Sequence, residues 1–302
     1  MRTMTSAVER LAAAVLAALL AALSPARAEI GVTDDLGRRV VLARPAQRIV
    51  SLAPHATELL FAAGAGDKVV AAVDYSDYPP PARRLPRIGS FASIDLERLL
   101  ALRPDLVVAW QSGNGAGTIE RLERLGLTVY VTESHRLEQI AADIERLGEL
   151  AGTGPAAARA AEAFRAKLAA LAARYGGQRP VRVFYQVWNQ PLTTVNGEQI
   201  ISQVLSLCGG RNVFAELPAL APTVDVEAVL AADPEAIIAS GMDLSRPEWL
   251  DDWRRWPQLQ AVRRGNLLFV PPDLLQRHSP RILDGAESVC RQLERVRAKD
   301  AP

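Results

Sequence analysis

Polar and aromatic side chains follow the predicted strands in the first half of the chain. Pro54 and His55 come directly after one strand, Tyr75 after the next and Trp110 after a third. The carboxyl ends of parallel strands are where an α/β sheet presents its ligand-binding groups. Aromatic rings at these positions could bury a large, flat, apolar ligand, although packing is the alternative for any single ring.

The second half repeats this arrangement with different chemistry. Trp188 follows one predicted strand, and Asp273 and Arg277 follow another. A carboxylate and a guanidinium could form hydrogen bonds with polar substituents of a ligand held by the rings. Together the two sets predict a binding site between two halves of the molecule.

No catalytic signature accompanies these residues. The sequence has no Gly-x-Ser-x-Gly elbow, P-loop or HExxH motif. Its three histidines, His55, His135 and His278, are far apart in sequence and are too few for the capture of zinc or manganese. His55 is either a ligand to the metal centre of a bound molecule or a polar residue at a helix N-terminus. Binding is favoured over an extracytoplasmic enzyme, which stays the alternative of a different class.

Short buried strands alternate with helices along most of the chain, which predicts parallel βαβ units. The strands are expected at 48–52, 69–73, 106–109, 128–131, 181–185, 236–239 and 267–270. An alanine-rich helical stretch from Leu137 to Tyr175, broken at 152–155, interrupts the alternation. We therefore expect two Rossmann-like α/β lobes, at 29–151 and 178–302, joined by a single long helix at 152–177.

An internal repeat supports two related lobes. Residues 93–109 align without gaps on 223–239, and six of the 17 positions are identical. Glu97 and Glu227 therefore occupy the same point of equivalent helices, one in each lobe. This placement suits paired contacts to a two-fold symmetric partner, whereas favourable charge at a helix N-terminus is the simpler interpretation. Both can hold.

Residues 1–28 have the pattern of a cleaved secretory signal. Two arginines precede an apolar run from Leu11 to Leu23, which is too short to span a bilayer, and Ala26-Arg27-Ala28 supplies a cleavage site. No cysteine lies near this point, so a lipid anchor is not expected. The chain should be a soluble periplasmic protein, and its formal net charge of +1 argues against a nucleic-acid partner.

The expected oxidation state of the two cysteines depends on that compartment. In an oxidising space Cys208 and Cys290 would form one structural disulfide, whereas in the cytosol they could be free thiols. A metal site is disfavoured because neither has a CxxC or histidine neighbour.

Several segments resemble periplasmic cobalamin-binding proteins, a family of class III substrate-binding proteins of ABC importers. The resemblance covers the mature chain, and its most specific parts are Tyr75–Pro79, the strand that ends in Trp110, and the cysteine pair. Thr57-Glu58 and Ser279-Pro-Arg281 also carry the resemblance, whereas residues 48–54 and 280–282 are general signatures shared with siderophore- and haem-binding relatives.

The resemblance implies a carrier that is not an enzyme, has no resident cofactor and delivers cobalamin to the membrane subunits and ATPase of an importer. Tyr75, Trp110, Asp273 and Arg277 would contact the corrinoid. Phe91 stands in place of a family tryptophan, and Trp188 could restore some aromatic area. Glu97 and Glu227 would dock onto arginines of the importer, and Cys208 would pair with Cys290. The free carrier is expected to be monomeric, and a haem- or ferric-siderophore-binding protein of the same fold is the main alternative.

Overall fold

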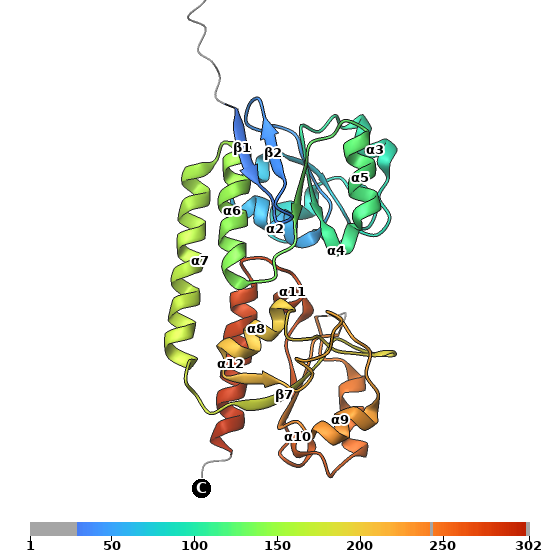
Figure 1. Ribbon diagram of the computed structural model, residues 1–302, viewed down its shortest axis with the longest axis vertical. Coiled ribbons are helices and arrows are strands. Elements are labelled where there is room, and N and C mark those ends of the chain that lie inside the picture. The colour runs from blue at the N-terminus through green and yellow to red at the C-terminus, as the bar shows by residue number, and fades with distance from the viewer. Residues whose placement is uncertain (1–28, 242–243, 300–302) are drawn as a thin grey trace, which may run out of the picture.

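The computed structural model describes residues 29–241 and 244–299, so the predicted signal segment lies outside the described residues. None of the helices in this part of the chain is long and apolar enough to cross a membrane. Two four-stranded parallel sheets organise the molecule, as expected from the alternation of strands and helices. We call the parts built around them the N-terminal and C-terminal lobes (Figure 1).

The sheet of the N-terminal lobe has the strand order β4-β3-β5-β6. Its strands are β3 (Ile49–Ser51), β4 (Val69–Ala72), β5 (Leu106–Trp110) and β6 (Val129–Thr132). The helices around this sheet are α2 (Pro54–Ala62), η1 (Gly66–Lys68), η2 (Pro80–Arg84), α3 (Leu96–Ala101), α4 (Gln111–Asn114) and α5 (Ala116–Arg124). An antiparallel hairpin of β1 (Ile30–Thr33) and β2 (Arg39–Leu42) precedes them.

The sheet of the C-terminal lobe has the order β10-β7-β11-β12. Its strands are β7 (Val181–Gln186), β10 (Gly210–Asn212), β11 (Ala236–Ala239) and β12 (Leu267–Phe269). The lobe also contains the short hairpin β8 (Trp188–Asn189) and β9 (Leu192–Thr193), with α8 (Ile200–Leu207), α9 (Val226–Ala232), η3 (Glu248–Arg255), α10 (Gln260–Arg263), α11 (Pro272–Leu275) and α12 (Ile282–Ala298).

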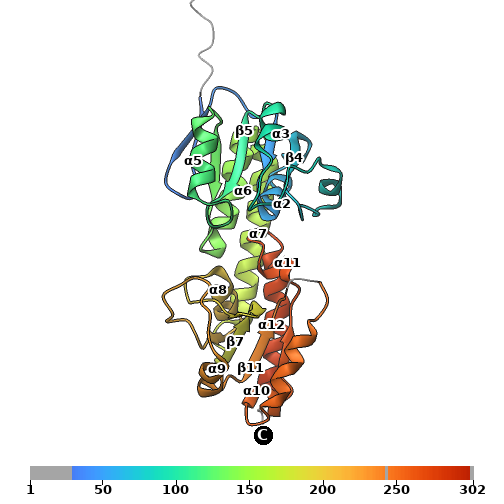
Figure 2. The same ribbon diagram turned by 90° about the vertical axis from the view of Figure 1, so that its right-hand side faces the viewer.

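The long helix α7 (Gly154–Tyr175) connects the lobes and follows α6 (Leu137–Ala151), the last helix of the N-terminal lobe. Gly152 ends α6 in the left-handed conformation, at φ 69°, which glycine adopts without steric cost. Helix α7 then runs along one side of both lobes, as the two views in Figures 1 and 2 show. The single long connecting helix predicted from the alanine-rich stretch is confirmed.

One hydrophobic core runs through both lobes on the side of α6 and α7. It includes Leu147, Ala161 and Phe164 from α6 and α7 and continues to Val289 and Leu293 of α12. Each sheet has a second, separate core on its opposite face, around Val107 and Ile237 respectively. Apolar packing along α7 therefore restrains the lobes in addition to the covalent connection.

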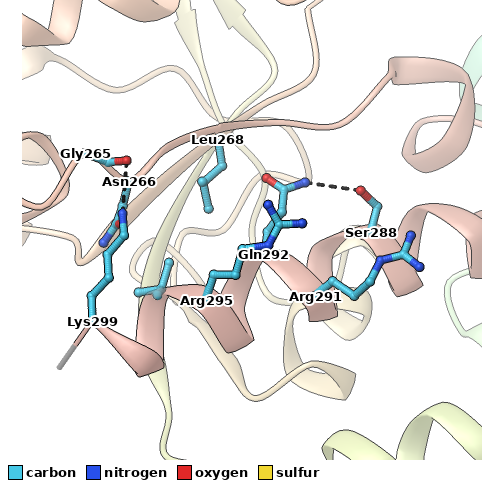
Figure 3. A pocket seen from close by; sticks show the side chains of 9 residues that line it. Gly265, Asn266, Leu268, Ser288, Arg291, Gln292, Arg295 and Lys299 are labelled. Atoms are coloured by element: carbon cyan, nitrogen blue, oxygen red, sulfur yellow. Dashed lines mark hydrogen bonds between the residues drawn. The ribbon is translucent and has the colours of Figure 1, made fainter. Parts of the chain in front are cut away.

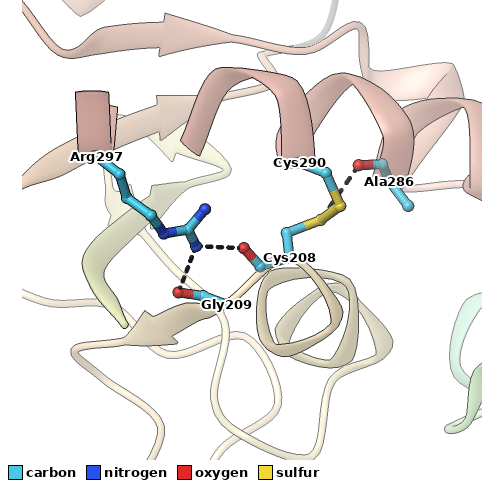
Figure 4. The surroundings of a disulfide bond; sticks show 5 residues. All are labelled: Cys208, Gly209, Ala286, Cys290 and Arg297. Atoms are coloured by element: carbon cyan, nitrogen blue, oxygen red, sulfur yellow. Dashed lines mark hydrogen bonds between the residues drawn. A yellow bond between two sulfur atoms is a disulfide. The ribbon is translucent and has the colours of Figure 1, made fainter. Parts of the chain in front are cut away.

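The predicted disulfide is present in the C-terminal lobe. Cys208 at the end of α8 is bonded to Cys290 in α12, with sulfur atoms 2.06 Å apart (Figure 4). Next to it, the Arg297 guanidinium donates hydrogen bonds to the carbonyl oxygens of Cys208 and Gly209 at 2.6 and 3.0 Å. The bond thus links two helices of one lobe across 82 positions of sequence.

Candidate ligand-binding site

Three predicted site residues form a ring cluster at the strand ends of the N-terminal lobe. The His55 ring meets the Trp110 ring edge-on at a centroid distance of 5.2 Å, and Trp110 lies 5.7 Å from Phe91. His55 is the second residue of α2, which begins with the predicted site residue Pro54, and Trp110 is the last residue of β5. Phe91 keeps 37% of its surface exposed, so the cluster offers an aromatic face.

Asn114 holds the loops of this cluster together. Its Oδ1 accepts a hydrogen bond from the Trp110 amide at 2.6 Å, and its Nδ2 donates to the carbonyl oxygens of Leu52 and Phe91 at 3.0 and 2.8 Å. The preceding residue, Gly113, lies against the indole, since a Cβ there would come within 1.9 Å of Trp110 Cε3. Asn114 and Gly113 thus fix the position of the tryptophan ring.

His55 faces a histidine of the other lobe. Its ring centroid is 5.9 Å from that of His278, and both side chains are buried. Burial, followed by the nearby His278 and Arg277, holds the pKa of His55 well below its ordinary value. Burial also lowers the pKa of His278 to about 4, so both imidazoles are neutral at neutral pH.

A buried ion-pair cluster joins the lobes next to these histidines. Glu58 of α2 is 3% exposed and accepts hydrogen bonds from Arg281, through Nε at 2.9 Å and Nη2 at 2.6 Å. Arg277 Nη1 donates to Glu58 at 3.0 Å, and the Ser279 hydroxyl donates to it at 2.6 Å. All four carboxylate contacts come from the C-terminal lobe, so the charge of Glu58 is well compensated despite its burial.

The two polar residues predicted to contact a ligand belong to the same cluster. Arg277 Nη1 also donates to Asp77 Oδ1 at 2.7 Å, and Asp273 Oδ2 accepts from Arg281 Nη1 at 2.7 Å. Partial burial raises the pKa of Asp77, but the hydrogen bond and charge of Arg277 outweigh it and hold that pKa below its ordinary value. Arg277 Nε and Nη2 and Asp273 Oδ1 have no hydrogen-bond partner among the described residues, so each side chain retains capacity for a ligand.

Tyr75 and Trp188 stand apart from the ring cluster. Tyr75 is 73% exposed and adopts φ 63°, a left-handed conformation that is uncommon for a residue other than glycine. Trp188 lies in the β8–β9 hairpin and packs edge-on against Trp249 at 6.4 Å. Both rings are therefore exposed on the surface and are not packed into the hydrophobic core.

Glu97 and Glu227 occupy equivalent places in the two lobes. Each is an exposed residue in the first turn of a short helix, α3 or α9, and each helix is capped by an aspartate two residues earlier. Asp95 accepts a hydrogen bond from the Arg98 amide at 3.0 Å, and Asp225 accepts one from the Ala228 amide at 2.7 Å. Both helices lie on the side of the molecule away from α7 (Figure 1).

Two of the hollows in the described part of the chain contain none of the predicted site residues. One, of about 400 Å³, is bordered by α12 and β12 and is lined by Arg291, Arg295 and Lys299 (Figure 3). It contains none of the predicted site residues. The other, of about 520 Å³, is lined by apolar residues of α2, α7 and α12 and borders Glu58 and Arg281.

The residues that sequence reasoning missed are those that act across lobes. Glu58 and Arg281 appeared only within segments that carry the family resemblance, and His278 only as one of three histidines far apart in sequence. No spacing rule could pair Glu58 with Arg281, because 223 positions separate them. A buried glutamate within an apolar helix was the one local signal that it required a partner.

Comparisons with known proteins found matches to both the sequence and the fold of the chain. Residues 49–274 match the family model described as periplasmic binding protein. The chain is 40% identical over 251 residues to a vitamin B12-binding protein of Vibrio cholerae serotype O1, which covers 83% of this chain and 90% of the relative. The crystal structure of the periplasmic vitamin B12 binding protein BtuF of Vibrio cholerae matches with a TM-score of 0.78 and 39% identity, over 84% of this chain and 98% of that one.

A second solved structure shares the fold at lower identity. The periplasmic heme-binding protein RhuT from Roseiflexus sp. RS-1, in its apo form, matches with a TM-score of 0.73 and 22% identity, over 83% of this chain and 98% of that one. At this identity the likeness concerns the fold alone.

Proposed function

The chain belongs to the periplasmic binding protein family, and from this membership we propose that it captures cobalamin between its lobes and delivers it to an ABC importer. The observation that carries the proposal is the 40% identity to a vitamin B12-binding protein over 83% of the chain. The ring cluster at the strand ends of the N-terminal lobe supplies a physical basis for it.

Aromatic side chains would contact the apolar parts of the corrinoid. The rings of Phe91 and Trp110 lie side by side. The exposed rings of Tyr75, in the N-terminal lobe, and Trp188, in the C-terminal lobe, add to the aromatic surface available for ligand contact. Burying such rings against a flat ligand removes a large apolar area from water and gains favourable ring contacts.

Polar side chains would orient the ligand. A corrin ring carries peripheral carboxamides, which both donate and accept hydrogen bonds. Arg277 can donate through Nε and Nη2 while its Nη1 stays bonded to Glu58 and Asp77. Asp273 can accept through Oδ1 while its Oδ2 stays bonded to Arg281. These residues would thus bind the ligand without breaking the contacts between the lobes.

Delivery would use the exposed glutamates. Glu97 and Glu227 would pair with arginines on the two membrane subunits of the importer, one for each lobe. The packed helix α7 and the core that passes through it favour a small change in lobe angle, so the importer would have to separate the lobes to release the ligand. The mature carrier would begin at Glu29, after removal of residues 1–28.

A thermal-shift and absorbance comparison of cyanocobalamin with haemin tests the proposal. Cyanocobalamin should raise the melting temperature of the protein, because a ligand that binds only the folded state stabilises it. Haemin should not raise the melting temperature. It should also give no protein-dependent Soret band, that is, none that is lost in the variant His55→Ala. A shift with haemin alone would contradict cobalamin as the ligand and would favour the haem-binding alternative.

A further inference from the structure

His55 and His278 are two buried imidazoles that face one another from different lobes. Their centroids are 5.9 Å apart and their ring planes are inclined by 39°. Neither nitrogen of His278 has a hydrogen-bond partner among the described residues, and its Nδ1 is fully buried. Buried polar atoms are nearly always satisfied, so an imidazole without a partner calls for an explanation.

The hydrogen bonds around His55 determine which of its nitrogens is free. The Thr132 hydroxyl donates its proton to the Ala109 carbonyl at 3.0 Å. The 3.0 Å contact between His55 Nε2 and Thr132 Oγ1 must therefore be a donation from the imidazole. In the neutral ring this leaves a lone pair on Nδ1, which has no partner in the described part of the chain.

This arrangement is the usual environment of a metal-binding histidine. Such a residue donates its second ring N–H to a neighbouring oxygen, and that bond fixes both the tautomer and the ring orientation. Thr132, held in turn by Ala109, has this role for His55. Burial keeps both imidazoles neutral, which is the form that binds metals.

The separation of the two rings also fits a shared ion. A nitrogen–metal distance of about 2.1 Å places the metal about 3.2 Å from the ring centroid. Two rings that share one ion therefore have centroids about 5 to 6.4 Å apart, depending on the angle at the metal. The observed 5.9 Å lies within this range.

We propose that His55 and His278 together bind one divalent late transition-metal ion, such as Zn²⁺, Ni²⁺ or Co²⁺, and so link the two lobes. Imidazole is a preferred ligand for these ions. The described residues contain no group of three or more histidine, cysteine or carboxylate side chains that could hold a metal. The remaining coordination positions therefore belong to water or to a small chelating molecule that arrives with the ion. The site does not depend on the identity of the organic ligand proposed above.

The experiment is a titration of the purified chain, without a histidine tag, with Zn²⁺ by calorimetry and with Co²⁺ by visible absorption. The wild type should bind one ion per chain, gain thermal stability and give the Co²⁺ bands of nitrogen ligation. His55→Ala and His278→Ala should each weaken binding at least about tenfold, and Thr132→Val, which removes the orienting oxygen, should weaken it about 10- to 100-fold.

His135→Ala is the comparison variant, because His135 is the only other histidine and is exposed; its charge, after burial, also lowers the pKa of His278, so it lies near that ring without facing His55 in a ring contact. It should bind the ion like the wild type. The proposal is overturned if the wild type binds no ion at several-fold molar excess, if His135→Ala is the variant that loses binding, or if His278→Ala binds unchanged. Circular dichroism checks folding, and if His55→Ala fails to fold, His278→Ala decides the outcome alone.

Discussion

Arg281 donates two hydrogen bonds to Glu58, from Nε at 2.9 Å and from Nη2 at 2.6 Å, and this pair connects the C-terminal lobe to the N-terminal lobe. Only 2% of the Glu58 side chain and 13% of the Arg281 side chain are exposed. When one partner of such a buried ion pair is removed, water cannot solvate the remaining charge, which is left uncompensated. The contact therefore fixes the relative position of two segments that are far apart in the sequence.

Glu58→Gln should lower the free energy of unfolding by roughly 3 kcal/mol, toward the lower end of the range for breaking a buried ion pair. The loss is limited because Asp273 still pairs with Arg281, and Asp77 still pairs with Arg277. Urea unfolding followed by circular dichroism measures it.

Glu145→Gln is the control for that variant. Glu145 forms a two-bond pair with Arg165, at 2.7 and 2.6 Å, but on the surface. Exposed pairs contribute below about 1 kcal/mol, so this change should be nearly neutral. Equal effects of the two substitutions would contradict the importance of the interlobe contact.

Gly113→Ala should displace the Trp110 ring, because the new Cβ would lie 1.9 Å from its Cε3 atom. We expect altered tryptophan fluorescence and at least about tenfold weaker cyanocobalamin binding, since a central aromatic contact is lost. Gly117→Ala is the control, because no heavy atom lies within 4 Å of its Cβ position. If Gly113→Ala leaves both fluorescence and affinity unchanged, Trp110 does not have the role assigned to it.

The contribution of His278 to the free energy of unfolding should fall as the pH is lowered from 6.5 toward 4; the lowered pKa of buried His55 acts in the same direction, and the raised pKa of the buried Asp143 carboxyl acts in the opposite one. The pKa of His278 is about 4 in the folded chain and 6.5 ordinarily, so the unfolded chain takes up the proton first. The contribution of neutral His278 to the free energy of unfolding is fully present above pH 6.5. Below pH 6.5 this contribution declines by up to about 1.4 kcal/mol per pH unit.

Urea unfolding at several pH values in the presence of EDTA measures this dependence without any bound metal. His278→Gln should make the decline shallower and leave the part that comes from His55, whereas His135→Gln should change it only slightly, because the charge of His135 is a smaller cause of the lowered pKa of His278 than burial is. An unchanged slope in His278→Gln would show that His278 does not resist protonation in the folded protein.

Reversing both docking glutamates should abolish import while leaving ligand affinity intact. The variant Glu97→Arg/Glu227→Arg places positive charge where arginines of the importer are expected, and like charges at an interface are strongly unfavourable. Uptake of labelled cobalamin by cells that depend on this carrier measures the effect. Glu149→Arg, an exposed change on α6, should support normal uptake. Normal uptake by the double variant would rule out the paired contacts.

The elements of the fold were predictable because their signals are local. Buried apolar runs marked β5 and β11, and the positive φ of Gly152 coincides with the break predicted between α6 and α7. By contrast, β10 consists of Gly210, Arg211 and Asn212, residues of low strand propensity, and it forms only because β7 lies beside it. Its presence follows from tertiary structure.

The site was predictable only in part, for a similar reason. Strand ends identified His55 and Trp110, and the family resemblance identified Phe91. The partners that complete the site depend on how the lobes approach each other. Neither the pairing of His278 with His55 nor that of Arg281 with Glu58 has a sequence signature, and Asn114 acquires its role only when three loops converge on it.

Calorimetric titration of the mature protein with cyanocobalamin is the decisive measurement of corrinoid binding. We expect saturable binding of one corrinoid per chain, weakened by Trp110→Ala and unaffected by Glu149→Arg. The absence of both heat and thermal stabilisation at saturating cyanocobalamin would contradict it.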